Sequence, residues 1–342
     1  MRSKHGNLSP WAGSALFWLA VAASVGSIGC TEPEVETFEF EPFAEAELRF
    51  AQPDSSPLRS FSPNDLKAES PDAAWIADPG IGAVFRFEPP RDDYRQMGFR
   101  DEPPGEVDRP AKLAVEKTLG LFTFDLGSGQ VHQFTPDGEP IRAFETGFVP
   151  ARFEIARSPI GLVFGRIDNR DPQQPRLIVV RTDTRGASPD TLLQPDSHGP
   201  PSLWMAIASS GELSLDGSES GLWAWAEAVP DTVFDITDRP DARKRVLRPQ
   251  DRDSMGILAD LDRHILWVVR AGGTPGELRF AAYDTREPGT VGPDRAFLGE
   301  RVTYSDFVPW DAIDGTIMGF RRPTPGRFML VSYDMRVPPT LP

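Results

Sequence analysis

The chain has 342 residues, among them 35 Pro and 30 Gly, and 51 acidic against 36 basic side chains give it a formal charge of −15 at pH 7. Helices tolerate few glycines and prolines, so this composition excludes a mainly helical protein. The acidic balance opposes binding to nucleic-acid phosphates, where Lys and Arg must displace counterions. A single cysteine excludes a framework of internal disulfides.

The N-terminus has the order of a secretory signal peptide. Arg2 and Lys4 precede an uncharged apolar run, "WAGSALFWLAVAASVGSIG", at residues 11–29. Its length is close to the roughly 20 residues that a membrane helix needs, but the small residues at its end favour cleavage. We therefore predict a signal peptide over residues 1–29.

The motif "SIGC", residues 27–30, resembles the lipobox of bacterial lipoproteins. Ile28 and Gly29 suit that motif, whereas Ser27 stands where an aliphatic residue is usual. The resemblance implies that Cys30 becomes the lipid-carrying first residue of the mature chain, and that Thr31 after it directs the protein to the outer membrane of the cell envelope. The alternative is a plain signal peptide with an incidental cysteine.

An acidic segment follows the cysteine. Residues 31–47 contain seven Glu, and we expect residues 30–45 to form an extended tether between the lipid and the fold. Removal of residues 1–29 takes away Arg2 and Lys4, so the formal charge of the mature chain falls to −17. An exported chain without disulfides must be held together by its apolar core.

Two stretches of the chain repeat each other at an offset of 47 residues. "WIADPGIGAVFRF", residues 75–87, aligns with "FTFDLGSGQVHQF", residues 122–134. The aligned pairs are Trp75 with Phe122, Asp78 with Asp125, Gly80 with Gly127, Gly82 with Gly129, Val84 with Val131, Phe87 with Phe134, and Pro89 with Pro136. The pattern predicts a strand, an Asp that binds the amides of the following turn, two glycines with positive φ, and a return strand.

Weaker copies of this unit continue to the C-terminus. The return strands are predicted to start at Val84, Val131, Leu177, Val233, Leu278 and Phe328, with spacings of 47, 46, 56, 45 and 50 residues. Each unit has room for about four strands, which is the content of one propeller blade. Six such units fill the chain.

The first two units resemble NHL repeats, and the whole chain resembles bacterial six-bladed β-propeller lipoproteins. The resemblance implies an all-β, six-bladed propeller of four-stranded blades over residues 46–342. The sixth unit is followed by "MRVPPTLP", whose prolines cannot pair as a strand. We therefore expect residues 46–51 to supply its outer strand and close the ring.

No motif for chemistry is found in the mature chain. Its three histidines, His132, His198 and His264, are isolated, and no EF-hand loop, G-x-S-x-G elbow or P-loop occurs. No metal, cofactor or catalytic residue is therefore predicted. Propeller enzymes of the gluconolactonase-like family hold a divalent metal in the central channel with a Glu, an Asn and an Asp, and that trio cannot be placed on this sequence.

A ligand-binding face is predicted instead. In the expected fold, the loops between the second and third strands lie at the same end as the links between blades. These loops are longest in the third, fifth and sixth units. The polar residues expected to line this face are Asp168, Arg170, Asp171, Arg270, Arg321 and Arg322. The alternative is that they are ordinary solvated loop residues.

These observations favour a non-enzymatic binding or scaffolding module, anchored to the membrane through Cys30, whose partner is an envelope protein or a small ligand. A sensor or assembly factor in an envelope complex overlaps that interpretation. The alternative is a propeller hydrolase, lactonase or lyase that uses a channel metal. Nucleic acid is not an expected partner.

Overall fold

The computed structural model describes the chain over residues 37–39, 42–47, 63–88, 93–97, 106–150, 152–157, 160–168, 176–193, 205–210, 221–226, 232–235, 243–247, 251, 254–260, 263–286, 297–304, 307–324 and 327–335. These residues form β-strands joined by turns, as the composition predicts. The strands assemble into six sheets, which are numbered here in chain order as sheet 1 to sheet 6.

Each sheet is built from four antiparallel strands, and sheet 5 carries one additional strand at its edge. Sheet 1 comprises β3 (Asp65–Ser70), β4 (Ala73–Asp78), β5 (Ala83–Glu88) and β6 (Asp93–Met97). Sheet 2 comprises β7 (Pro110–Glu116), β8 (Gly120–Asp125), β9 (Gln130–Phe134) and β10 (Pro140–Glu145). Sheet 3 comprises β11 (Arg152–Arg157), β12 (Ile160–Asp168), β13 (Arg176–Thr182) and β14 (Asp190–Leu193).

The remaining sheets follow the same plan. Sheet 4 comprises β15 (Met205–Ser210), β16 (Gly221–Ala226), β17 (Thr232–Asp235) and β18 (Arg243–Val246). Sheet 5 comprises β19 (Ser254–Asp260), β20 (Ile265–Ala271), β21 (Glu277–Asp284) and β22 (Phe297–Tyr304), with β1 (Thr37–Glu39) added at its outer edge. Sheet 6 comprises β23 (Phe307–Ile313), β24 (Thr316–Thr324) and β25 (Arg327–Asp334), with β2 (Pro42–Glu47) as its outer strand.

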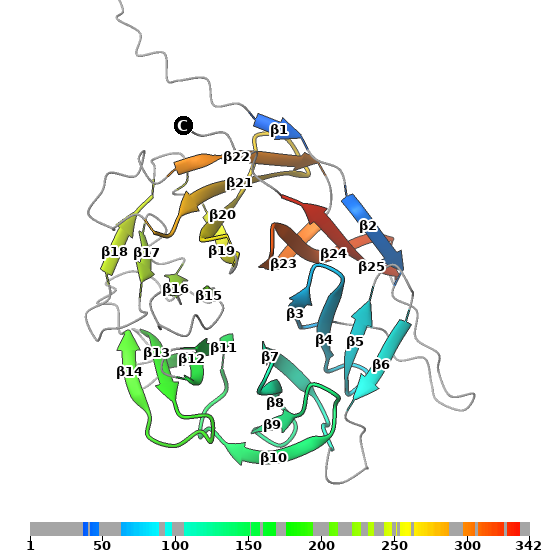
Figure 1. Cartoon of the computed structure of the whole chain (residues 1–342), viewed down its shortest axis with the longest axis vertical. Helices are drawn as coiled ribbons and strands as arrows, with labels where there is room; N and C mark the ends of the chain where they lie inside the picture. Colours follow the sequence, from blue (N-terminus) through cyan, green and yellow to red (C-terminus); the bar gives the residue numbers. More distant parts are fainter. Residues whose placement is uncertain are drawn as a thin grey trace, which may run out of the picture. The chain divides into compact units, whose positions relative to one another are not determined.

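The first strand of every sheet lies at the centre of a ring (Figure 1). Going round the ring, β3 lies beside β7, β7 beside β11, β11 beside β15, β15 beside β19, β19 beside β23, and β23 beside β3. The chain from Thr37 onward is therefore a β-propeller with four-stranded blades. Each return strand predicted from the repeat starts within the third strand of a sheet, because the alternation of strand and turn is local.

The N-terminal strands lie on the outer edges of the last two sheets. β2 pairs antiparallel with β25, from Pro42 opposite Tyr333 to Glu47 opposite Met329. β1 pairs in parallel with β22, with Thr37 opposite Glu300. The sequence predicted an outer strand at residues 46–51. The strand that forms, β2, begins four residues earlier, at Pro42. Strand pairing also begins at Thr37, within the segment expected to be a tether.

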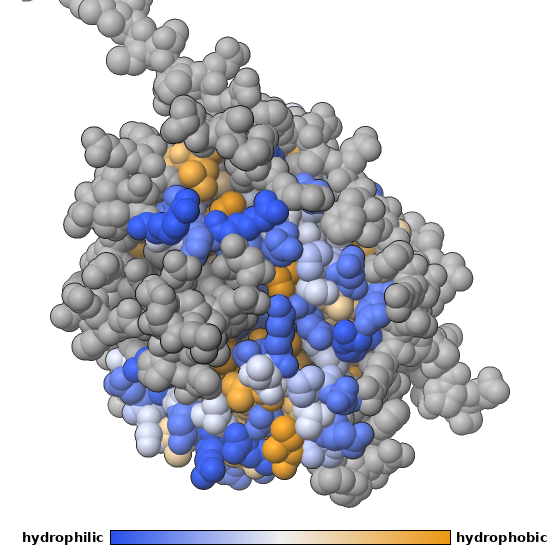
Figure 2. Space-filling model, in the orientation of Figure 1, coloured by the Kyte–Doolittle hydropathy of each residue, from blue (hydrophilic) through white to orange (hydrophobic). Residues whose placement is uncertain are grey.

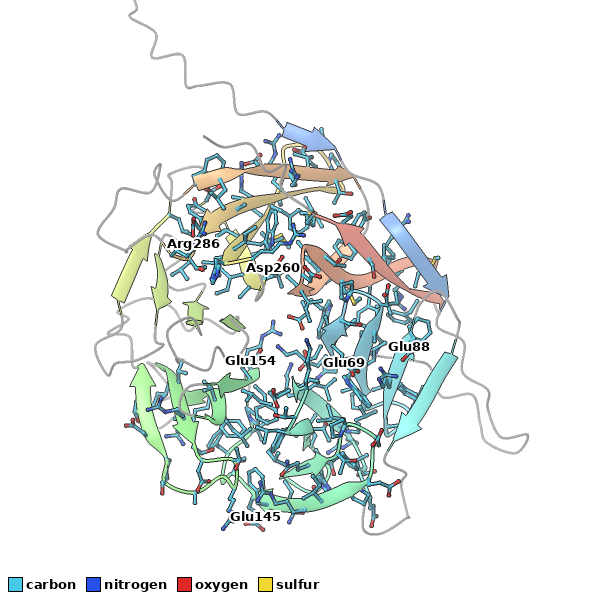
Figure 3. All side chains as sticks on the ribbon, in the orientation of Figure 1. Glu69, Glu88, Glu145, Glu154, Asp260 and Arg286 are labelled. Carbon is cyan, nitrogen blue, oxygen red and sulfur yellow. The ribbon has the colours of Figure 1, made fainter. Side chains whose placement is uncertain are left out.

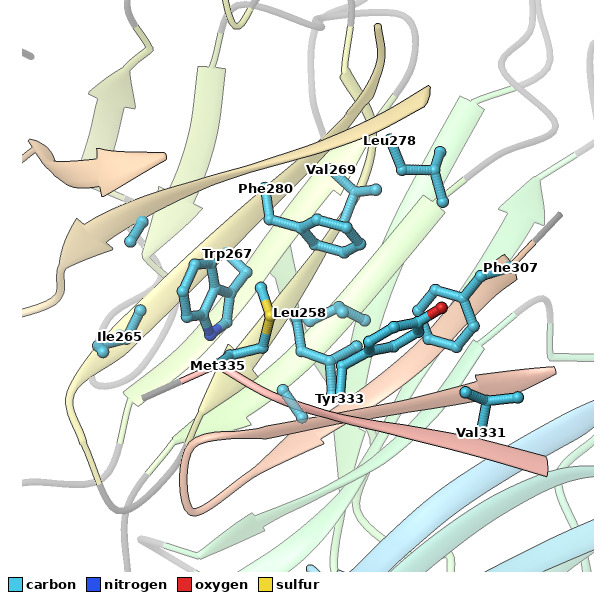
Figure 4. Packing of buried hydrophobic residues seen from close by; sticks show 13 residues of the cluster. Leu258, Ile265, Trp267, Val269, Leu278, Phe280, Phe307, Val331, Tyr333 and Met335 are labelled. Atoms are coloured by element: carbon cyan, nitrogen blue, oxygen red, sulfur yellow. The ribbon is translucent and has the colours of Figure 1, made fainter. Parts of the chain in front are cut away.

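Apolar residues pack between neighbouring sheets. The cluster between sheets 5 and 6 contains Trp267, Phe280 and Tyr333, all buried (Figure 4). Similar clusters join sheet 6 to sheet 1, sheet 1 to sheet 2, sheet 2 to sheet 3, and sheet 4 to sheet 5. Large aromatic side chains bury much apolar area each, which lets a chain without disulfides hold a ring of thin sheets together.

Candidate binding site at the ring axis

The two turns that repeat in the sequence have one structural role. The Asp78 carboxylate accepts hydrogen bonds from the N–H groups of Gly80 and Ile81, at 2.8 and 2.9 Å. The Asp125 carboxylate accepts from the N–H of Gly127 at 2.9 Å in the same way. The predicted binding of turn amides by aspartate is confirmed.

Only the second glycine of each turn needs a positive φ, which corrects the expectation for both. Gly82 and Gly129 have φ of 79° and 73°, while Gly80 and Gly127 are absent from the positive-φ residues. A Cβ on Gly127 would lie 2.5 Å from the Asp108 carboxylate, so this glycine is required for close approach.

Asp125 also ties its turn to the link between sheets 1 and 2. Its carboxylate accepts from the backbone N–H groups of Asp108 and Arg109, at 3.2 and 2.6 Å. Burial alone would raise the pKa of this carboxyl, but the amide hydrogen bonds outweigh it and lower the pKa. The turn between the second and third strands therefore lies at the same end as the link between sheets. That end is called the link face below.

The predicted ligand residues that the structure describes come from sheets 3, 5 and 6. Asp168 ends β12, where its backbone pairs with Arg176. Arg170 and Asp171 lie outside the described residues. Arg322 is exposed, with its guanidinium 5.3 Å from the centre of the Phe328 ring. No contact joins these residues into one site in the part of the chain that is described, and their role in ligand binding stays a prediction.

Arg270 is held in a network of ion pairs within sheet 5 and its preceding link. Its Nη2 donates to Glu300 at 2.6 Å, and its Nε lies 3.3 Å from an oxygen of buried Asp251. The other oxygen of Glu300 accepts from Arg279, whose Nε donates to Glu277. The guanidinium of Arg270 thus serves carboxylates of its own chain, and its side chain is only 16% exposed.

A second group of charges lies on the inner strands. This axial charge cluster is defined by Asp65, Lys67, Lys112, Arg152, Glu154 and Asp311, which come from β3, β7, β11 and β23. Glu154 is seen at the central opening of the ring (Figure 3). The inner strands of sheets 6, 1, 2 and 3 thus bring together charges that are up to 246 residues apart in the sequence.

Lys67 connects two inner strands, β3 and β11, that are not direct neighbours in the ring. Its Nζ donates to Glu154 Oε2 at 2.5 Å, which joins sheet 1 to sheet 3 past the strand of sheet 2 that lies between them. Burial opposes the charged ammonium, but the carboxylates of Glu154, Asp311 and Asp65 outweigh burial and raise the pKa of Lys67. Lys67 is therefore charged at any physiological pH.

Asp311 is the acidic neighbour on the other side of Lys67. Its Oδ2 accepts from the backbone N–H of Ala68 at 2.8 Å, which ties sheet 6 to sheet 1. Burial raises the pKa of Asp311 to about 6, and the negative charge of Glu154 adds to that rise while Lys67 opposes it. This carboxyl therefore changes its protonation near neutral pH.

Lys112 and Arg152 lie nearer the link face on adjacent inner strands. Lys112 is the third residue of β7, and Arg152 is the first of β11. Burial lowers the pKa of Lys112, and the positive charges of Arg152 and Lys67 lower it further, against the attraction of Asp65. Asp65 uses its oxygens to accept from the N–H groups of Leu66 and Leu113, at 3.1 and 2.7 Å.

Several exposed apolar side chains lie at the same end of the ring, in different sheets and links. Of the large hydrophobic residues that the described ranges leave exposed, four lie on the link face, namely Leu126, Val149, Met255 and Val308. The first two lie in a turn and a link, and the others near the starts of β19 and β23. Figure 2 shows one face of the propeller, on which apolar side chains form separate patches among hydrophilic ones. Single exposed apolar residues of this kind are normal on protein surfaces and do not by themselves indicate a partner.

No cluster of three or more His, Cys, Asp or Glu side chains suited to a metal ion is found among the described residues. Within those residues there is also no helix that is long and apolar enough to cross a membrane. Cys30, the predicted lipid site, lies outside them.

Comparison with known proteins supports the fold alone. No protein-family model and no curated protein matches the sequence. A candidate exported protein from Bacteroides fragilis NCTC 9343 superposes with a TM-score of 0.51 at 11% identity, over 88% of this chain and 99% of that one. This likeness supports the overall fold of the chain and nothing beyond it.

Two further matches have TM-scores below 0.5. A candidate gluconolactonase matches at a TM-score of 0.48 and 12% identity, covering 87% of this chain and 95% of its own. Virginiamycin B lyase from Staphylococcus aureus matches at 0.44 and 15%, covering 78% of this chain and 79% of its own.

Sequence reasoning missed the axial charge cluster. One signal was present: the chain has only five lysines, and two of them, Lys67 and Lys112, lie in consecutive repeat units. Their partner Glu154 is 87 residues beyond Lys67, so nothing in the local pattern could indicate the pairing.

Proposed function

We propose that this protein is an exported, lipid-anchored β-propeller that acts as a binding module in the cell envelope. The observation that carries the proposal is the position of the Lys67 ammonium between the carboxylates of Glu154 and Asp311. A propeller enzyme of the gluconolactonase-like kind would use axial carboxylates to hold a divalent metal.

Electrostatics supports this choice. An ammonium at hydrogen-bond distance from Glu154 already balances the carboxylate charge and would repel a second cation in the same space. The charges of the cluster also balance, with three acidic and three basic side chains. Such a site holds the inner strands together and leaves the link face available for a partner.

The direct test is metal binding by residues 31–342, purified without Cys30. We expect no stoichiometric Ca²⁺, Mg²⁺, Mn²⁺ or Zn²⁺ by elemental analysis, and no rise in melting temperature when each ion is added. One equivalent of a divalent ion that is lost in Glu154→Gln would overturn the proposal in favour of a metal-dependent propeller enzyme.

The membrane anchor is tested separately on the full chain. When it is produced in a bacterium fed labelled palmitate, the native chain should carry label and fractionate with membranes, and Cys30→Ala should do neither. An unlabelled native chain would leave a plain signal peptide as the explanation. Seven residue steps join Cys30 to Thr37, so an extended segment of at most ~25 Å would connect the lipid to β1.

We further propose that β2 closes the ring, supported by its antiparallel pairing with β25. Deletion of residues 31–52 would remove β1 and β2 and leave the edges of β22 and β25 unpaired, which lowers stability and promotes aggregation. We expect a clear fall in melting temperature, whereas deletion of residues 31–36 should leave it unchanged. Equal melting temperatures for the two deletions would refute closure by β2.

A further inference from the structure

The second strands of sheets 3 and 6 are longer than those of the other sheets. β12 and β24 have nine residues each, whereas β4, β8 and β16 have six and β20 has seven. The extra residues lie at the link face, because β11 begins opposite Gly165 and β23 begins opposite Arg321. Residues 166–168 and 322–324 therefore continue beyond the inner strands. In sheets 1, 2, 4 and 5 the corresponding extension is one residue or none.

An arginine is the first residue of both extensions. The guanidinium of Arg166 lies 5.0 Å from the centre of the Phe148 ring, and that of Arg322 lies 5.3 Å from the centre of the Phe328 ring. Phe148 belongs to the link before sheet 3, and Phe328 belongs to β25. An aromatic face holds a guanidinium by a cation–π contact and leaves the N–H donors at its edge free for other partners.

The positive charges of these two arginines are not balanced inside the chain. Within the residues that the structure describes, Arg166 and Arg322 form no hydrogen bond and no ion pair, and Nε of Arg166 is buried without an acceptor. By contrast, Arg86 and Arg279 each form an ion pair with a glutamate. The chain has 51 acidic side chains, so carboxylates are abundant, yet none pairs with the two stacked arginines. Their donors are available to an acid from outside the chain.

The two arginines lie on opposite sides of the ring axis. Two sheets separate sheet 3 from sheet 6 in either direction around the ring, and β12 and β24 lie across the central opening from each other (Figure 1). Val149, which follows Phe148 in the link, is 63% exposed, so an apolar side chain adjoins one of the stacked pairs. A ligand that contacts both arginines must extend over the link face, which favours a macromolecule over a small molecule.

We propose that the link face binds an acidic segment of a partner protein, with Arg166 and Arg322 as the two anchors for its carboxylates. This inference rests on the proposed binding function and names the partner class. Guanidinium groups recognise carboxylates in bidentate geometry, and arginines and aromatic residues are enriched among the residues that dominate protein interfaces. An anionic membrane fits less well, because its continuous negative charge would repel a chain with a formal charge of −15.

Peptide selection tests the partner class before the partner itself is identified. Short random peptides displayed on phage are selected on residues 31–342, the preparation used for metal analysis. We expect the recovered peptides to be enriched in Asp and Glu flanked by apolar residues. Recovery of no binding peptide, or of binders without acidic enrichment, would overturn the inference.

Titration of the strongest selected peptide then tests the two arginines. Arg166→Gln and Arg322→Gln should each weaken its binding about tenfold, and the double variant about a hundredfold, since each change removes a charge-assisted hydrogen bond. The matched control is Arg185→Gln, because Arg185 is exposed in the turn after β13, at the opposite end of the ring. The control should bind as the native chain does, and unchanged binding by the double variant would contradict the inference.

Melting temperatures show whether each variant is folded. If Arg166→Gln is not folded, the exposed Arg322 decides by itself. A loss of about tenfold in Arg322→Gln then supports the inference, and an unchanged affinity contradicts it.

Vesicles test the competing occupant. Sedimentation with vesicles of phosphatidylcholine and phosphatidylglycerol should carry down no more native chain than phosphatidylcholine alone. Sedimentation that depends on phosphatidylglycerol and is lost in the double variant would replace the partner protein by a membrane surface. A divalent metal bound by the same preparation would contradict the proposed function, whereas peptide binding that depends on neither arginine would contradict only this inference.

Discussion

The link-side turns of sheets 1 and 2 are nearly the same, whereas the inner strands of these sheets differ. In both turns a buried aspartate accepts hydrogen bonds from the amides that follow it, and a glycine with positive φ completes the reversal. On the inner strands, the position of Asp65 in sheet 1 is taken by Lys112 in sheet 2. A residue that recurs in both sheets stabilises each blade. A residue that differs between the sheets acts at the axis, of which the ring has only one.

The largest expected effect lies at the axis. Lys67→Met would leave the carboxylates of Glu154 and Asp311 without their counter-charge, and we expect a loss of about 4 kcal/mol in the free energy of unfolding, as when one partner of a buried pair is removed. Denaturant titration at neutral pH measures it. Lys67→Met combined with Glu154→Gln should recover much of the loss; if it recovers none, the ion pair is not the cause.

Removal of a turn aspartate should lower the free energy of unfolding by a smaller amount, which increases with the number of hydrogen bonds lost. Asp125→Ala leaves amides of its own turn and of the preceding link without an acceptor, and should cost roughly 3 kcal/mol. Asp78→Ala removes its bonds to Gly80 and Ile81 and should cost about 2 kcal/mol. Thermal unfolding of both variants beside Asp137→Ala, an exposed control, gives the order. An Asp78→Ala variant less stable than Asp125→Ala would contradict it.

Substitution of the two turn glycines distinguishes the energetic cost of a positive φ from the cost of steric crowding. Gly82→Ala and Gly129→Ala both place a Cβ in the left-handed region, at about 1 kcal/mol each. A Cβ at Gly82 would also lie 2.7 Å from the backbone oxygen of Asp108, whereas that of Gly129 meets no atom within 4 Å. We therefore expect Gly82→Ala to be the less stable variant in parallel thermal melts. Equal losses would mean that the link at Asp108 can move aside.

The last effect is a pH dependence of stability that comes from Asp311. Burial raises its pKa from 3.8 to about 6, so between these values the folded state binds more protons than the unfolded state. This carboxyl therefore favours folding below pH 4, and its contribution falls as pH rises to about 6. The unfolding free energy of the native chain minus that of Asp311→Asn should fall by roughly 2 kcal/mol between pH 4 and pH 7. A constant difference would show that Asp311 ionises normally.

The sequence predicted only part of the candidate site. The link face was inferred from the order of strands, because loop positions follow directly from that order. The Arg270 network and the axial charge cluster were missed, because their members come from separate strands and links whose spacing carries no local signal. The predicted outer strand was displaced by four residues, since the register of β2 depends on its pairing with β25 rather than on its own pattern.

The sequence by itself determined the all-β class, the repeating strand and turn, the aspartates that bind the turn amides, and the return strands. These are local properties, decided by residues within a few positions of one another. Only the tertiary structure decided which side chains meet at the axis, since Lys67 reaches Glu154 across an intervening sheet. It also decided that β1 and β2 pair with the last two sheets, because a strand edge can be completed by any segment that the ring brings within reach.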